Sequence, residues 1–117
     1  MRFSETHFSQ DDLANISAIT VSEILIGLHS AQTDEQRSHR QSFYDDLLES
    51  VQILSFDRIA AEVHSRIWFL MRSTGNTIGA NDTLIAATAI ANQCALLTNN
   101  VREFARVPGL EVIQPTW

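Results

Sequence analysis

The sequence contains no lysine and only one cysteine, Cys94, among its 117 residues. A single cysteine cannot form a disulfide within the chain, which fits a reducing compartment and predicts a cytoplasmic protein. No apolar run approaches the roughly 20 residues that a membrane-spanning helix needs. The first residues also lack the apolar stretch of a signal peptide. We therefore expect neither export nor a membrane span.

Glycine and proline are scarce as well, with four and two residues, and there is no repeat, low-complexity stretch or linker-like segment. Hydrophobic residues make up 44% of the chain and charged residues 19%. This balance permits a hydrophobic core and disfavours disorder. The composition predicts one folded domain over residues 1–117.

All eight basic residues are arginines, and fourteen acidic residues bring the formal net charge to −6. Proteins that bind nucleic acid through a phosphate-tracking groove are usually basic, so the overall charge argues against such a groove. Arginine is nevertheless suited to fork-like contacts with phosphate. A bound cation can also make an acidic site accept a phosphate. A small, metal-dependent phosphate site therefore remains open.

Short apolar segments alternate with segments whose apolar residues recur at helical spacing. We predict strands at 16–19, 51–56, 94–98 and 110–113, and helices at 20–30, around Phe43, Leu47 and Leu48, at about 57–73, at 82–92 and at 101–105. The alternation predicts an α/β fold with a mostly parallel sheet.

The segment 57–73 carries the clearest helical signal. Asp57 is the expected cap at its start, and Gly75 is expected to end it. Its predicted apolar face comprises Ile59, Val63, Ile67 and Leu70. The segment 82–92 is apolar on nearly all sides, which predicts a helix buried within the domain.

Two carboxylates stand out by their positions relative to the predicted strands and helices. Glu23 comes within one helical turn of the first predicted strand, and Asp82 opens the apolar helix. Sites in α/β folds gather at the carboxyl ends of strands, and converging carboxylates are ligands for Mg²⁺ or Mn²⁺. The same residues have a purely structural explanation. Thr20 and Glu23 fit a capping box, and Asp82 fits a helix cap.

Two arginines, Arg102 and Arg106, lie four residues apart after the third predicted strand. They could bind a phosphate, although a solvated helical turn shows the same pattern. His64 follows Val63 on the amphipathic helix and is predicted to lie at the boundary of the core rather than to act as a base.

Three segments carry a more specific pattern: ISAITVSEILIG at 16–27, GNTIGANDTLIAA at 75–87 and LTNNVREFARVPGL at 97–110. In order and separation they resemble the motifs of PIN-domain proteins, in particular VapC-type toxins. The resemblance covers residues 16–117. It implies a doubly wound, three-layer α/β/α sandwich, Mg²⁺- or Mn²⁺-dependent cleavage of RNA, often tRNA, a VapB-type antitoxin as partner, and a homodimer.

The resemblance also implies roles for particular residues. Glu23 and Asp82 match the family's acidic residues, and Asn100 occupies a position where many relatives carry aspartate. These three are the predicted catalytic residues. The predicted metal ligands are the same three residues and Glu103, which is expected to substitute in part for the missing charge. Thr98, which would position the loop, and Arg102 are the predicted substrate-binding residues.

One family feature is missing. Relatives begin with a strand that ends in Leu-Asp-Thr-Asn, whose aspartate is a main metal ligand, and this motif is not present. Residues 1–15 are atypical, and no apolar strand precedes Asp11 and Asp12, so they are not expected to replace it. We expect the first β–α unit to be missing and two strand edges to be left unpaired. The alternative to an active nuclease is therefore a catalytically impaired PIN-like module that binds a VapB-type antitoxin or an intact toxin.

Overall fold

The computed structural model describes residues 3–4 and 14–114. Its elements are β1 Phe3–Ser4, β2 Ala14–Ser17, α1 Ala18–His29, α2 Asp34–Ser50, β3 Val51–Leu54, α3 Arg58–Thr74, α4 Ala80–Ala91, β4 Leu96–Leu97, α5 Val101–Phe104 and β5 Val112–Ile113. The predicted alternation of strands and helices is confirmed. The strand predicted at 16–19 lies two residues earlier, as β2, and the other three predicted strands are shorter than expected. Asp11 and Asp12 lie outside the described residues.

The strands form two hydrogen-bonded groups. β2 pairs in parallel with β3, and β4 pairs in parallel with β5, which confirms the mostly parallel sheet. β1 pairs antiparallel with β4, with Phe3 opposite Leu97, and also lies beside β2 without joining its ladder. Among the described residues, only the short β1 therefore lies between the two parallel pairs, where we expected a gap.

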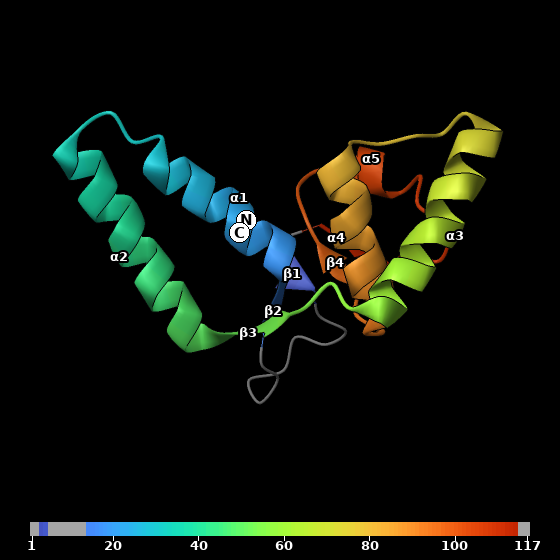
Figure 1. Ribbon diagram of the computed structural model, residues 1–117, viewed down its shortest axis with the longest axis horizontal. Helices are drawn as coiled ribbons and strands as arrows, with labels where there is room; N and C mark the ends of the chain where they lie inside the picture. The colour runs from blue at the N-terminus through green and yellow to red at the C-terminus, as the bar shows by residue number, and fades with distance from the viewer. Residues whose placement is uncertain (1–2, 5–13, 115–117) are drawn as a thin grey trace.

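The molecule has two arms (Figure 1). α1 and α2 form one arm, and α3 and α4 pack side by side in the other, next to β4 and α5. The main hydrophobic core lies in the second arm and comprises Val63, Ile67, Met71, Ile85, Ala86, Ala87, Leu96, Phe104 and Val107. α4 runs through this core, and the prediction of a buried helix is confirmed.

Local sequence signals set both ends of α3. The Oδ1 atom of Asp57 accepts a hydrogen bond from the Ala60 N–H at 3.0 Å, which satisfies one of the free amides of the first turn. Gly75 ends the helix in the left-handed region, with φ of 73°, where glycine carries no Cβ penalty. Both predictions are confirmed.

The apolar face of α3 differs in part from the prediction. Val63 and Ile67 are buried, but Ile59 is 53% exposed and Leu70 is 49% exposed. Ala60 and Met71 are buried instead. The buried positions then follow one stripe at spacings of three and four residues, and α4 packs on this stripe.

α2 begins earlier than the sequence indicated. The sequence predicted this helix only around Phe43, Leu47 and Leu48, but most of the polar stretch 31–41 before them lies inside it. Thr33 caps the helix by accepting from the Gln36 N–H at 3.0 Å, and the Gln36 side chain accepts from the Gln32 N–H at 3.0 Å. This reciprocal pattern resembles a capping box and stabilises a helix that buries little apolar surface. Leu47 is buried, but its predicted neighbours Phe43 and Leu48 are exposed.

Within the described part of the chain, no helix combines the length and the apolar character that crossing a membrane would require.

Candidate active site

The first turn of α4 forms the centre of the candidate site. Gly79, and not Asp82, occupies the N-cap position, so the interpretation of Asp82 as the cap is wrong. Asp82 is the third residue of the helix. A Cβ atom added to Gly79 would lie 3.9 Å from the Oδ2 atom of Asp82. The carboxylate therefore adjoins the amino end of α4, where the helix dipole favours negative charge.

Glu103 connects α5 to the same turn. One carboxylate oxygen accepts a hydrogen bond from the Gly79 N–H at 3.2 Å, and the other accepts from the Asn100 side-chain amide at 2.8 Å. Gly79 has no side chain to cap α4, and Glu103 takes over that function from outside the helix. Three predicted site residues, Asp82, Asn100 and Glu103, thus meet around Gly79.

Thr98 holds the loop that carries Asn100. The Thr98 side chain is 2% exposed, and its hydroxyl accepts from the Asn100 N–H at 3.0 Å. This bond fits the predicted role of Thr98 in positioning the loop, whereas its contact with a substrate stays a prediction. Arg102 lies exposed on α5, and its role with a substrate also stays a prediction. Arg106 donates instead to the Thr77 carbonyl at 3.3 Å and connects the segment after α5 to the loop before α4.

Glu23 lies on a different element, α1. The Ser17 hydroxyl accepts from the Ile19 N–H at 3.0 Å, so Ser17 is the N-cap of α1. The helix begins at Ala18, and the interpretation of Thr20 and Glu23 as a capping box is wrong. Glu23 is half-buried in the second turn of α1, which packs against α4. A shared role for the Glu23 and Asp82 carboxylates stays a prediction.

Thr20 was interpreted from the sequence only as part of a cap, and the structure adds it as a further candidate residue beside Glu23. It is 3% exposed, and its hydroxyl has no hydrogen-bond partner among the described residues. Buried hydroxyls are rarely left unpaired. Thr20 lies three residues before Glu23 and so shares its helix face. The only sequence signal was its place directly after a predicted strand.

The donor set fits a small divalent cation. Within residues 3–4 and 14–114, no three His, Cys, Asp or Glu side chains are grouped as a closed metal site. Mg²⁺, however, is commonly held by one or two carboxylates, with water and substrate phosphates completing its shell. Asp82 and Glu103 supply two carboxylates beside Gly79, and Asn100 adds an amide oxygen.

Comparison with known proteins assigns this arrangement to a family. A family model described as PIN domain matches residues 7–110. The chain is 33% identical over 112 residues to a protein named Ribonuclease VapC from Rickettsia bellii, covering 96% of this chain and 84% of that protein. It is 28% identical to a tRNA(fMet)-specific endonuclease VapC from Salmonella typhimurium, covering 83% and 71% of the two chains.

A solved structure shares the fold. The crystal structure of VapBC2 from Rickettsia felis, bound to a DNA fragment from its promoter, matches with a TM-score of 0.78 and 30% identity. The match covers 85% of this chain and 72% of that chain. The α/β/α architecture expected from the three motifs is thereby confirmed, and the chain belongs to the PIN-domain family, among its VapC-type members.

Proposed function

We propose that this chain is a metal-dependent endoribonuclease of the VapC type, with tRNA as the substrate class. The observation that carries the proposal is the meeting of Asp82, Glu103 and Asn100 around Gly79 at the amino end of α4. The proposal is also supported by similar proteins, which are described as ribonucleases and, in one case, as a tRNA(fMet)-specific endonuclease.

The residues of the site have distinct roles in this proposal. Asp82, Glu103 and Asn100 would hold Mg²⁺ or Mn²⁺, with Glu23 completing the set from α1. When bound, such an ion makes a water molecule more acidic and neutralises charge on a phosphodiester. Glu103 also holds the Asn100 amide, and Thr98 fixes the Asn100 backbone. These bonds orient the ligand set before substrate arrives, which limits reorganisation during the reaction.

The direct test is cleavage of a purified tRNA pool by the full chain. We expect cuts at defined positions with Mg²⁺ or Mn²⁺ and none after EDTA, because the carboxylates alone do not supply the positive charge that a phosphodiester needs. Gel or sequencing analysis of the fragments measures the result. Restoring excess metal after EDTA is the control. Equal cleavage with and without metal would contradict the proposal.

We also propose a VapB-type antitoxin as partner and a homodimer as the state of the toxin. The antitoxin partner is supported by structural neighbours that are VapBC and FitAB complexes on DNA.

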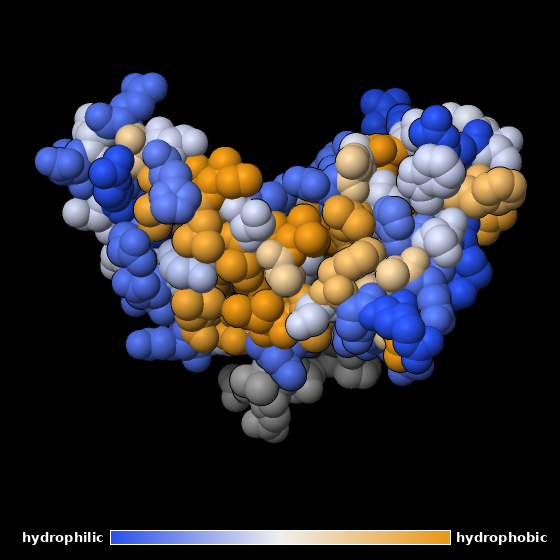
Figure 2. Space-filling view, in the orientation of Figure 1, coloured by the Kyte–Doolittle hydropathy of each residue, from blue (hydrophilic) through white to orange (hydrophobic). Residues whose placement is uncertain are grey.

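The homodimer is supported by the apolar surface of the molecule. Figure 2 shows apolar side chains gathered on one face over the α1–α2 arm and the centre of the molecule. Exposed apolar residues of that arm and of β3 include Ile26, Phe43, Leu48 and Ile53.

A charge among the exposed apolar residues of the α1–α2 arm should separate the dimer. Ile26 is 59% exposed on α1, and Ile26→Asp would place an uncompensated carboxylate in an apolar interface. We expect the mass from light scattering to fall from that of a dimer to that of a monomer. Phe69→Asp, on the exposed face of α3, is the matched control and should leave the mass unchanged. A wild-type monomer at micromolar concentration would contradict the homodimer.

A second candidate function is that of a catalytically impaired interaction module. It is favoured by the absence of a closed three-acid site among the described residues and by the single short β1 between the two parallel strand pairs. A chain that melts cooperatively and binds a VapB-type peptide, but cleaves no RNA at any metal concentration, would support this second candidate over the nuclease.

A further inference from the structure

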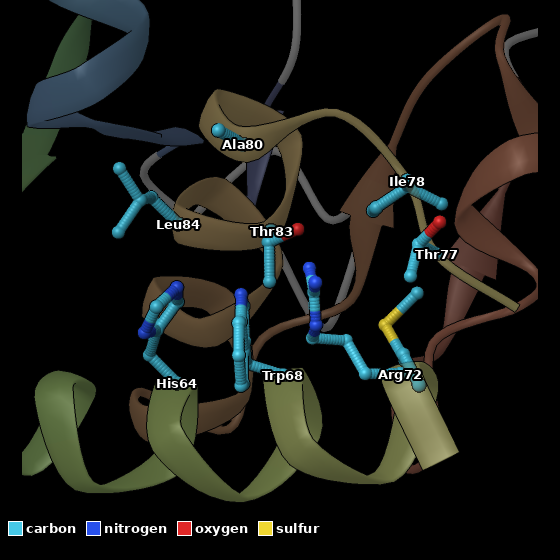
Figure 3. Close-up of a pocket in the computed structure, with 9 residues that line it drawn as sticks. His64, Trp68, Arg72, Thr77, Ile78, Ala80, Thr83 and Leu84 are labelled. Atoms are coloured by element: carbon cyan, nitrogen blue, oxygen red, sulfur yellow. The ribbon is translucent and has the colours of Figure 1, made fainter. Parts of the chain in front are cut away.

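A pocket lies between α3 and α4, and Asp82 is not among the residues that line it. Its volume is about 340 Å³, which falls within the range of small-molecule sites, roughly 300–1,000 Å³. Figure 3 shows the lining side chains. They are His64, Trp68, Met71, Arg72, Thr77, Ile78, Ala80, Thr83 and Leu84.

One wall of the pocket consists of three flat groups. His64, Trp68 and Arg72 are spaced four residues apart on α3 and project in the same direction, toward α4 (Figure 3). The Arg72 guanidinium lies over the Trp68 ring, 4.5 Å from its centroid. The His64 ring meets Phe56 edge to face, with 5.9 Å between centroids. These contacts restrain the orientation of the three side chains.

The three groups offer N–H donors that the protein does not use. Within residues 14–114, no acceptor forms a hydrogen bond with the Arg72 guanidinium, the Trp68 indole or the His64 ring. No aspartate or glutamate lines the pocket. In a chain of net charge −6, this is a local site of positive charge. Its chemistry matches an anionic group rich in acceptor oxygens.

The opposite wall is mostly apolar, although Thr77 and Thr83 also line the pocket. Ile78, Ala80 and Leu84 face the three donors across the pocket (Figure 3). A ligand that fills the pocket therefore combines an anion with a flat or apolar body. A nucleotide does so, with its phosphate oxygens and its base.

The position of the pocket relative to the acidic site favours RNA over an acidic peptide. Ala80 and Thr83 line the pocket and flank Asp82 in the first turn of α4. The Thr83 hydroxyl donates to the Gly79 carbonyl at 2.9 Å, and the Gly79 N–H donates to Glu103. A single helical turn thus separates the pocket from the carboxylates. A strand lying across this turn would place neighbouring nucleotides in both sites.

We propose that this pocket is a nucleotide subsite for RNA: Arg72 and the Trp68 indole bind a phosphate, and the base packs against Ile78 and Leu84. The inference rests on the proposed ribonuclease function, because it extends the path of the same substrate. Arg72 and Trp68 act here as binding residues and take no part in bond cleavage.

Binding can be measured without cleavage. In the full chain with Trp117→Phe, Trp68 is the only tryptophan, and its fluorescence reports on the pocket. Asp82→Asn and EDTA prevent hydrolysis. The probe is a short single-stranded RNA. An acidic peptide of similar length and charge is titrated separately for comparison. Arg72→Gln tests the anion contact. Arg66→Gln on the same helix, which lies outside this pocket, is the matched control.

We expect RNA binding to quench the fluorescence of Trp68. Arg72→Gln should lower the affinity for RNA about tenfold, as expected for losing hydrogen bonds to a charged group. The slope of log affinity against log salt should become shallower by about 0.7 for one lost phosphate contact. Arg66→Gln should change the affinity by less than about twofold. Melting curves confirm that both variants fold.

Two results would overturn the subsite. One is equal RNA affinity for Arg72→Gln and Arg66→Gln, and the other is quenching by the acidic peptide but not by RNA. A failure of the nuclease proposal would give a different result. RNA would then bind in an Arg72-dependent manner, but the wild-type chain would not cut it. Cleavage that persists together with Arg72-independent binding would refute only the subsite.

Discussion

Asp82→Asn is expected to abolish metal-dependent RNA cleavage while leaving the protein folded. The substitution keeps the size of the side chain and removes its charge from the site beside Gly79. We expect a loss of at least about 100-fold in kcat, the scale reported for removing one electrostatic stabiliser from an active site. Gel-based cleavage of a tRNA pool with Mn²⁺, compared with EDTA, measures the effect.

A matched variant separates this effect from helix stability. Asp34 lies in the first turn of α2, as Asp82 lies in the first turn of α4. Each substitution by asparagine should cost about 0.3–1 kcal/mol of favourable interaction with the helix dipole. Asp34→Asn should nevertheless cleave at the wild-type rate. Undiminished cleavage by Asp82→Asn would remove Asp82 from the site.

Phe104→Ala is expected to have the largest effect on stability. Phe104 is fully buried and is the largest such side chain, within the cluster formed by α3, α4 and β4. Removing a buried phenyl ring leaves a cavity and lowers the free energy of unfolding by about 3–5 kcal/mol. Domains of this size are stable by only about 5–15 kcal/mol. Urea denaturation followed by circular dichroism measures the loss.

The control for this prediction is another phenylalanine. Phe69 is 67% exposed on α3, so Phe69→Ala should change the free energy of unfolding by no more than about 0.5 kcal/mol. Phe104→Leu keeps most of the buried volume and should lose less than about 1.5 kcal/mol. Equal losses for Phe104→Ala and Phe69→Ala would show that the core does not depend on Phe104.

Local signals in the sequence were accurate where one or two residues decide the outcome. Asp57 and Gly75 bound α3 as predicted, because a cap bond and a left-handed residue depend only on neighbours in the chain. The burial of α4 was also predictable, since nearly all its positions are apolar. The capping pattern at Thr20 misled, because Ser17 caps the helix three residues earlier and Thr20 already lies inside the first turn.

Packing decided which apolar residues are buried. Ile59 and Leu70 are as apolar as Val63 and Ile67, yet they lie exposed, because α4 covers only one stripe of α3. The early start of α2 had a local signal in Thr33 and Gln36, which the density of polar residues concealed. Helices with little apolar surface are difficult to recognise by periodicity.

The sequence by itself determined the family of this protein, its α/β alternation and the identity of its acidic residues, because motifs and periodicity are properties of the chain. Only the tertiary structure decided that Glu103 joins Gly79 to Asn100 and that an arginine–tryptophan pocket lies across the same turn. These contacts join residues from different elements, and α4 brings them together because its burial in the core fixes where its amino end lies.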